Sequence, residues 1–106
     1  MYIVIFVTAS GVEEAEKISS KLIENKLAAC VNMIDGVKSV FWWQGKLDNT
    51  KEVLLMIKSK KSKLPQIIKL VKSLHSYDLP EIIALPVIAG EKSYLRWIDE
   101  SLRKPV

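Results

Sequence analysis

The sequence predicts an α+β fold, a ferredoxin-like split βαβ sandwich with an antiparallel sheet. The expected elements run strand, helix, strand, strand, helix, strand and C-terminal helix, which gives two successive strand–helix–strand halves. Two of the strands, at residues 3–7 and 53–57, are unbroken apolar runs, as expected for the two central strands. The last strand contains Pro86, which favours a position at the sheet edge.

The first half begins with a strand over residues 2–8, where β-branched and aromatic residues dominate. A helix follows. Ser10 is expected as its N-cap, and Glu13 completes a capping box three residues later. The helix is expected to end near Asn25, with its apolar side chains on one face: Ala15, Ile18, Leu22 and Ile23.

A long hairpin is expected next. Residues 28–46 predict a long strand that is interrupted at Asp35-Gly36, a turn or bulge signal. The polar cluster Asp48-Asn49-Thr50 predicts the turn, and residues 52–59 predict the returning strand.

The second half begins with a helix that Ser62 can cap and whose first turn tolerates Pro65. A loop over residues 75–80 and a strand over residues 81–88 follow. The C-terminal helix carries helically spaced apolar residues: Tyr94, Trp97, Ile98 and Leu102.

Composition indicates one globular domain over residues 1–106, with 49% hydrophobic and 26% charged residues. The net charge is +4, and the basic excess lies between Lys51 and His75. That segment has no arginine and no aromatic residue, so we interpret it as a solvated helix face and expect no nucleic-acid partner. No apolar run approaches the length of a membrane span, and we expect neither a signal peptide nor a membrane contact. A single cysteine, Cys30, excludes an internal disulfide framework, which favours the cytoplasm.

The apolar central strands also predict self-association. Two helices cover only one face of a four-stranded sheet, so the other face would expose apolar side chains. The edge strand carries Phe41, Trp42 and Trp43, and the two indoles point to opposite faces, so we expect at least one of them to contact another subunit. In the rival arrangement, the C-terminal helix lies across the open face.

One loop offers candidate metal ligands. His75 is the only histidine, and Tyr77, Asp78 and Glu81 follow it closely. Imidazole with carboxylates suits several divalent ions, although a histidine at a helix C-terminus can simply favour the helix dipole. Cys30 could meet His75, but a lone cysteine at a strand start is more typical of a core residue. No constellation of catalytic residues is recognisable, so we predict that the protein is not an enzyme.

Several motifs resemble the CutA divalent-cation tolerance family over nearly the whole chain. They are the segment 24–32, the run 43–46, Glu52-Val53 with Ile57-Lys58, the loop 75–81 and the segment 94–97. The resemblance implies a homotrimer of PII-like architecture that functions in the cytoplasm in tolerance to copper and other divalent metals. From this resemblance and from the position of His75 beside Asp78 and Glu81, we predict His75 as a metal ligand, with Cys30 as a lesser candidate. Val7 and Leu74 stand where some family members have copper ligands.

Two other functions remain open. In a PII-like signalling trimer, clefts between subunits would bind a small anionic ligand through Glu52, Lys58, Tyr77 and Glu81, beside His75. A purely structural assembly platform is the third hypothesis.

Overall fold

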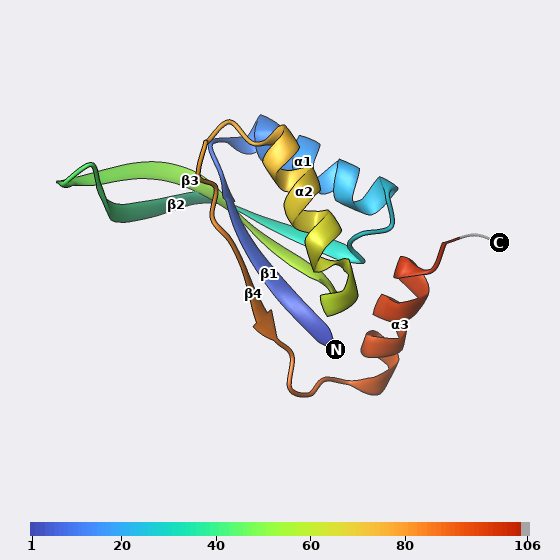
Figure 1. Ribbon diagram of the computed structural model, residues 1–106. Coiled ribbons are helices and arrows are strands. Elements are labelled where there is room, and N and C mark those ends of the chain that lie inside the picture. Colours follow the sequence, from blue (N-terminus) through green and yellow to red (C-terminus); the bar gives the residue numbers. More distant parts are fainter. Residues whose placement is uncertain (105–106) are drawn as a thin grey trace.

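The computed structural model describes residues 1–104 as a four-stranded sheet with two helices on one face and a third helix near one end (Figure 1). The predicted ferredoxin-like α+β fold is confirmed. The elements, including one added 3₁₀ turn (η1), are β1 Tyr2–Ala9, α1 Val12–Glu24, β2 Cys30–Trp43, β3 Lys46–Lys60, η1 Lys61–Lys63, α2 Leu64–Leu74, β4 Ile82–Pro86 and α3 Lys92–Leu102.

The sheet order is β2-β3-β1-β4, and every neighbouring pair is antiparallel. The two unbroken apolar strands, β1 and β3, are therefore central, and the strand that ends at Pro86 is an edge, as predicted. This order follows from burial, because the strands richest in apolar side chains gain most from having neighbours on both sides.

The core lies between the sheet and helices α1 and α2. Alternate residues of the central strands point toward these helices, as the period-two geometry of a strand requires. Ile23 is exposed rather than part of the helix face as predicted, because it lies about 100° around the helix from Leu22. The main fully or nearly fully buried members of the core are Ile3, Ile5, Val7, Ala15, Ile18, Leu22, Leu55, Ile57, Ile67 and Val71.

The opposite face of the sheet is only partly covered. Helix α3 contacts this face at Tyr2 and Lys60, the residue pair at the end of the β1–β3 ladder. The Tyr2 hydroxyl donates a hydrogen bond to Asp99 at 2.5 Å, and Lys60 forms an ion pair with Asp99 at 2.8 Å. Ile83 and Leu85 on the edge strand β4 remain exposed. The C-terminal helix therefore covers only one end of this face, and not the whole face as in the rival arrangement.

Strands β2 and β3 continue beyond the sheet as a two-stranded arm (Figure 1). The arm turns at Gln44 and Gly45, which both have positive φ, 51° and 77°. A two-residue turn of this kind matches the twist of the flanking strands. The predicted turn at residues 48–50 is wrong, since these polar residues continue the ladder of β3 opposite β2. The arm raises the radius of gyration to 14.5 Å, against about 13 Å for a compact chain of this length.

A β-bulge at Asp35-Gly36 confirms the predicted interruption. Ile34 pairs with Leu54, but the next pair is Val37 with Glu52, so β2 carries one extra residue. Gly36 has a φ of 75°, and its N–H donates to the Asp35 carboxylate at 2.7 Å. Because side chains alternate along a strand, the extra residue exchanges the two faces of β2 beyond this point.

Two predicted helix caps are wrong. Gly11 rather than Ser10 is the N-cap of α1, and Ser10 instead donates from N–H and Oγ to the carboxylate of Glu14. The carboxylate that accepts from Ser10 is thus that of Glu14 rather than the expected Glu13, and the two hydrogen bonds do not form a reciprocal capping box. Lys63 rather than Ser62 precedes α2, because the 3₁₀ turn η1 supplies the entry to that helix.

Within residues 1–104, no helix combines the length and the apolar content that crossing a membrane would require.

Candidate functional site

An open groove of 790 Å³ lies where the arm leaves the sheet. Its volume is within the range of small-molecule sites. The arm forms one wall, and the end of β1 with the loop after α2 forms the other. The lining residues are Thr8, Ser39, Val40, Phe41, Trp42, Trp43, Asp48, Thr50, Glu52, Tyr77, Asp78, Leu79 and Glu81.

The strand register decides which side chains of the arm face this groove. Glu52 lies opposite Val37, and alternate positions from there place Thr50, Phe41 and Trp43 on the same face. Trp42 therefore points to the other face of the arm, which confirms that the two indoles of the Trp42-Trp43 pair are divided between faces.

The groove is acidic although the chain as a whole is cationic. Four carboxylates line it, those of Asp48, Glu52, Asp78 and Glu81, and no described lining residue is a lysine or arginine. The whole chain has a net charge of +4. The local potential therefore favours a cation over an anion.

Three of the predicted cleft residues influence one another electrostatically. Burial, and then the nearby charge of Glu52, raise the pKa of the Glu81 carboxyl. Burial, and then the charge and proximity of the Glu52 carboxylate, raise the pKa of the Tyr77 hydroxyl. Glu52, Tyr77 and Glu81 thus form one cluster, in which a bound cation would relieve the repulsion between carboxylates.

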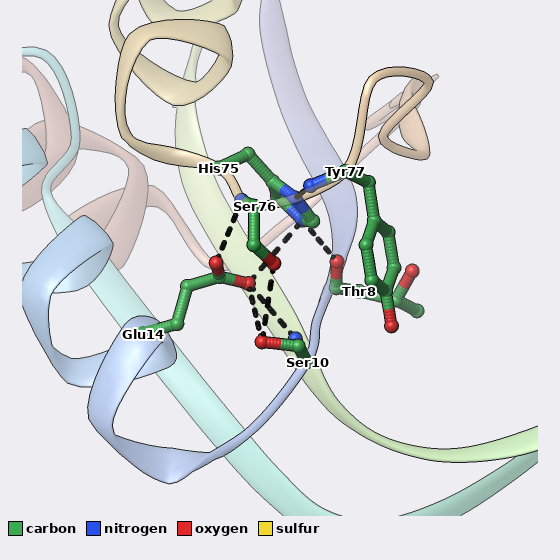
Figure 2. Close-up of polar contacts among 6 residues, drawn as sticks. All are labelled: Thr8, Ser10, Glu14, His75, Ser76 and Tyr77. Carbon is green, nitrogen blue, oxygen red and sulfur yellow. Dashed lines mark hydrogen bonds and ion pairs between the residues drawn. The ribbon is translucent and has the colours of Figure 1, made fainter.

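The His75 side chain is fully buried, and its ring lies beside that of Tyr77, with 4.8 Å between the ring centroids (Figure 2). Its Nε2 is 2.6 Å from the carbonyl oxygen of Thr8, and its Nδ1 accepts the N–H of Tyr77 at 3.0 Å. These partners require a neutral ring with the proton on Nε2. Both ring nitrogens are therefore engaged, and the imidazole holds the start of the loop against β1.

Glu14 fixes the same loop from the helix side (Figure 2). Its carboxylate accepts the Ser76 N–H at 2.7 Å, in addition to the two hydrogen bonds from Ser10. Burial alone would raise the pKa of Glu14, but these hydrogen bonds lower it overall. The first turn of α1 is thereby tied to the loop that carries Tyr77 into the groove.

Two of the predicted site residues lie elsewhere. Cys30 and Lys58 pair with each other across β2 and β3, and Lys58 also pairs with Val4. The histidine contacts Thr8, four residues farther along β1, which is about 13 Å. Cys30 and His75 are therefore not brought together, and Lys58 does not line the groove.

The described part of the chain does not bring together a complete set of metal ligands. Within residues 1–104, no group of three His, Cys, Asp or Glu side chains could hold an ion. The imidazole and thiolate donors that suit copper are separated, and the imidazole is already bonded on both nitrogens. The clustered donors are carboxylate oxygens, which suit hard divalent ions that keep much of their water.

Several lining residues lie outside the predicted site. Asp48 and Thr50 belong to a cluster of turn-forming composition, and Thr8 lies in an apolar strand. The signal for Asp48 and Thr50 is their even spacing with Glu52, since positions 48, 50 and 52 lie on one face of a strand.

Known proteins resemble the chain over most of its length. The divalent-cation tolerance protein CutA of Archaeoglobus fulgidus is 43% identical over 102 residues, 96% of this chain and 99% of that protein. The chloroplastic protein CutA 1 of Oryza sativa is also 43% identical over 102 residues, but this chain spans only 58% of its length. The chain likewise spans 56% of the chloroplastic CutA of Arabidopsis thaliana.

Solved structures show the same fold. The periplasmic divalent cation tolerance protein CutA from Archaeoglobus fulgidus has a TM-score of 0.95 at 43% identity, covering 97% of this chain and 100% of that one. The divalent cation tolerance protein from Thermus thermophilus has a TM-score of 0.94 at 40% identity, covering 95% and 98%.

The names of these relatives correct the predicted cytoplasmic location. One is named periplasmic and two plant relatives are named chloroplastic, so membership of this group does not imply the cytoplasm. The inference from cysteine content was wrong because a chain with one cysteine forms no internal disulfide in any compartment.

The family model agrees with the relatives. The model of the CutA1 divalent ion tolerance protein matches residues 3–101. This range contains every helix and strand, apart from the first residue of β1 and the last residue of α3. That name describes tolerance to ions rather than a catalysed reaction. With the ferredoxin-like sheet and the relatives at about 40% identity, this match shows that the chain belongs to the CutA1 divalent ion tolerance family.

Proposed function

We propose that the protein acts in divalent-cation tolerance as a homotrimer and binds divalent cations weakly in the acidic groove. One observation supports this most directly: four carboxylates and no basic residue line the groove of a chain whose net charge is +4. Glu52 and Glu81 form the centre of the site, because the Glu52 carboxylate is close enough to raise the pKa of the partly buried Glu81 carboxyl.

The donor set favours hard ions over copper. Two carboxylates of one protomer, completed by water, suit Mg²⁺ or Mn²⁺ at modest affinity. Copper binding at His75 remains a prediction, and it requires displacement of either the Thr8 carbonyl or the Tyr77 N–H from the imidazole. Cys30 would bind copper only as a separate site, since it lies on another part of the sheet.

The exposed arm supports the trimer. Val40, Trp42 and Leu47 lie on the arm face that points away from Glu52, and they are 62%, 73% and 67% exposed. Exposed apolar side chains clustered on a two-stranded ribbon are typical of a protein interaction surface. Phe41 and Trp43, also predicted as interface residues, lie on the groove face, so an interface that includes them would adjoin the groove.

The groove weighs against the PII-like alternative. Lys58, predicted with His75 as a basic residue of an anion site, lies six residues along β3 from Glu52, about 20 Å away. We also propose no enzymatic activity, since Cys30 and His75 are too far apart to form a nucleophile and base pair.

Calorimetric titration with MnCl₂, MgCl₂ and CuCl₂ tests cation binding. We expect Glu52→Gln to weaken Mn²⁺ binding about tenfold, because one ligand charge is lost without a change of volume. Glu24→Gln is the matched control, since Glu24 is an exposed residue at the end of α1. His75→Gln tests the copper ligand in the same titration. Equal Mn²⁺ isotherms for wild type and Glu52→Gln would contradict the proposed site.

Light scattering during size-exclusion chromatography tests the trimer. Wild type should elute as a species of about 36 kDa, three times the chain mass of 12.0 kDa. Trp42→Ala should shift the population toward smaller species, whereas Trp97→Ala on α3 should not. A wild-type species of 12 kDa at micromolar concentration would exclude the trimer.

A further inference from the structure

The acidic groove also contains aromatic side chains. Phe41 and Trp43 from the arm and Tyr77 from the loop line it together with the four carboxylates. Aromatic faces attract organic cations through their quadrupole, whereas a hydrated metal ion is held by carboxylate oxygens alone. The aromatic wall is therefore not explained by metal binding.

Glu52 provides an independent observation. It is only 7% exposed, yet none of the lysine, arginine or histidine side chains within residues 1–104 forms an ion pair with it. The Tyr77 hydroxyl is its neutral neighbour. A buried carboxylate that lacks a cationic partner is costly, and the cost is relieved when a cation binds against it.

We propose that this groove binds a linear aliphatic polyamine, a molecule with two or more protonated amines separated by methylene groups. Each ammonium can donate hydrogen bonds to a carboxylate such as Glu52 or Glu81. The methylene groups and the remaining charge can lie against Trp43 and Phe41. A quaternary ammonium fits less well, because it has no N–H to donate to carboxylates.

The arrangement of charge supports a molecule with several amines. Asp48 lies out along the arm, Glu52 lies near its base, and Asp78 and Glu81 lie on the opposite wall. The carboxylates Asp48 and Glu52 are four residues apart on one strand face, about 13 Å along the strand. A single ammonium cannot reach both positions, whereas a polyamine can.

Calorimetry with spermidine tests the proposal, with wild type compared with three variants at fixed ionic strength. Trp43→Leu should weaken spermidine binding about fivefold through loss of the cation–π contact, and should leave Mn²⁺ binding unchanged. Glu52→Gln should weaken binding of both ligands about tenfold. Trp97→Leu, which alters an indole on the remote helix α3, should change neither.

The two ligands separate the outcomes. Spermidine binding that Trp43→Leu and Glu52→Gln both weaken supports the polyamine site, whether or not Mn²⁺ binds. Spermidine binding that is absent in wild type, or equal in all four proteins, overturns it, and Mn²⁺ binding that Glu52→Gln weakens would then leave the proposed cation site standing. Circular dichroism and light scattering confirm that each variant keeps the fold and assembly of wild type.

Discussion

Replacement of Glu14 by alanine tests the role assigned to its carboxylate. The side chain is 14% exposed and accepts three hydrogen bonds, from the N–H and Oγ of Ser10 and from the N–H of Ser76. A hydrogen bond to a charged group is worth about 1.5–3 kcal/mol. Ser10 and Ser76 are exposed, so water replaces most of what is lost, and we expect a net cost of about 2 kcal/mol.

The stabilisation by Glu14 should depend on pH in a defined direction. The pKa of the Glu14 carboxyl is lower in the folded protein than in the unfolded chain. Its contribution is therefore fully present above the unfolded pKa, about 4.3, and is lost as pH falls through the folded pKa. Glu14→Gln should destabilise the protein at pH 7 by about 1 kcal/mol, and the difference from wild type should shrink below pH 4.

Urea denaturation at one fixed protein concentration measures both effects, because the stability of an oligomer depends on concentration. Glu16→Ala, an exposed residue on the same helix, is the matched control and should change stability by less than about 0.5 kcal/mol. Amide exchange at Ser76 should accelerate in the Glu14 variants. If Glu14→Ala and Glu16→Ala have equal stability and equal exchange at Ser76, the carboxylate does not hold the loop.

Three further perturbations have defined outcomes. Gly45→Ala should cost about 1 kcal/mol of stability in urea denaturation, since its φ is 77°, whereas Gln44→Gly should be neutral or stabilising because φ there is 51°; an equal loss in both would contradict the assigned turn. Ile57→Ala should cost about 2–5 kcal/mol by the same measurement, because its side chain is fully buried, and a smaller loss would mean that the core collapses around the site. Mn²⁺ affinity should rise with pH through the raised pKa of Glu81, as protons cease to compete, and calorimetry between pH 4.5 and 7 would show a flat profile if Glu81 takes no part.

Much of the fold could be predicted because burial decides it. The unbroken apolar strands had to be central, and Pro86 had to be at an edge, so the sheet order followed from the sequence. Local backbone geometry was harder to predict. Residues 48–50 have turn-forming composition, but the turn lies at Gln44-Gly45, where two consecutive residues take left-handed conformations. Composition alone does not show which polar cluster bends the chain.

The site was predictable only in part, and strand geometry explains the difference. The structure brings Glu52, Tyr77 and Glu81 together, because the loop after α2 ends beside the middle of β3. Lys58, predicted for the same cleft, shares a strand face with Glu52 but lies far along the same strand. Whether the spacing between two residues of a strand is even or odd indicates whether their side chains share a face. The distance along the strand decides whether the two side chains are in contact.

The extra residue at Asp35-Gly36 has a consequence for how this surface can change in evolution. Without it, β2 would pair regularly, with a single residue opposite Val53, and Val37 would still lie opposite Glu52. One codon removed there would therefore straighten the strand and leave Phe41 and Trp43 on the groove side. The length of this strand can thus vary by one residue at the bulge while relatives keep the same side chains on the wall of the groove.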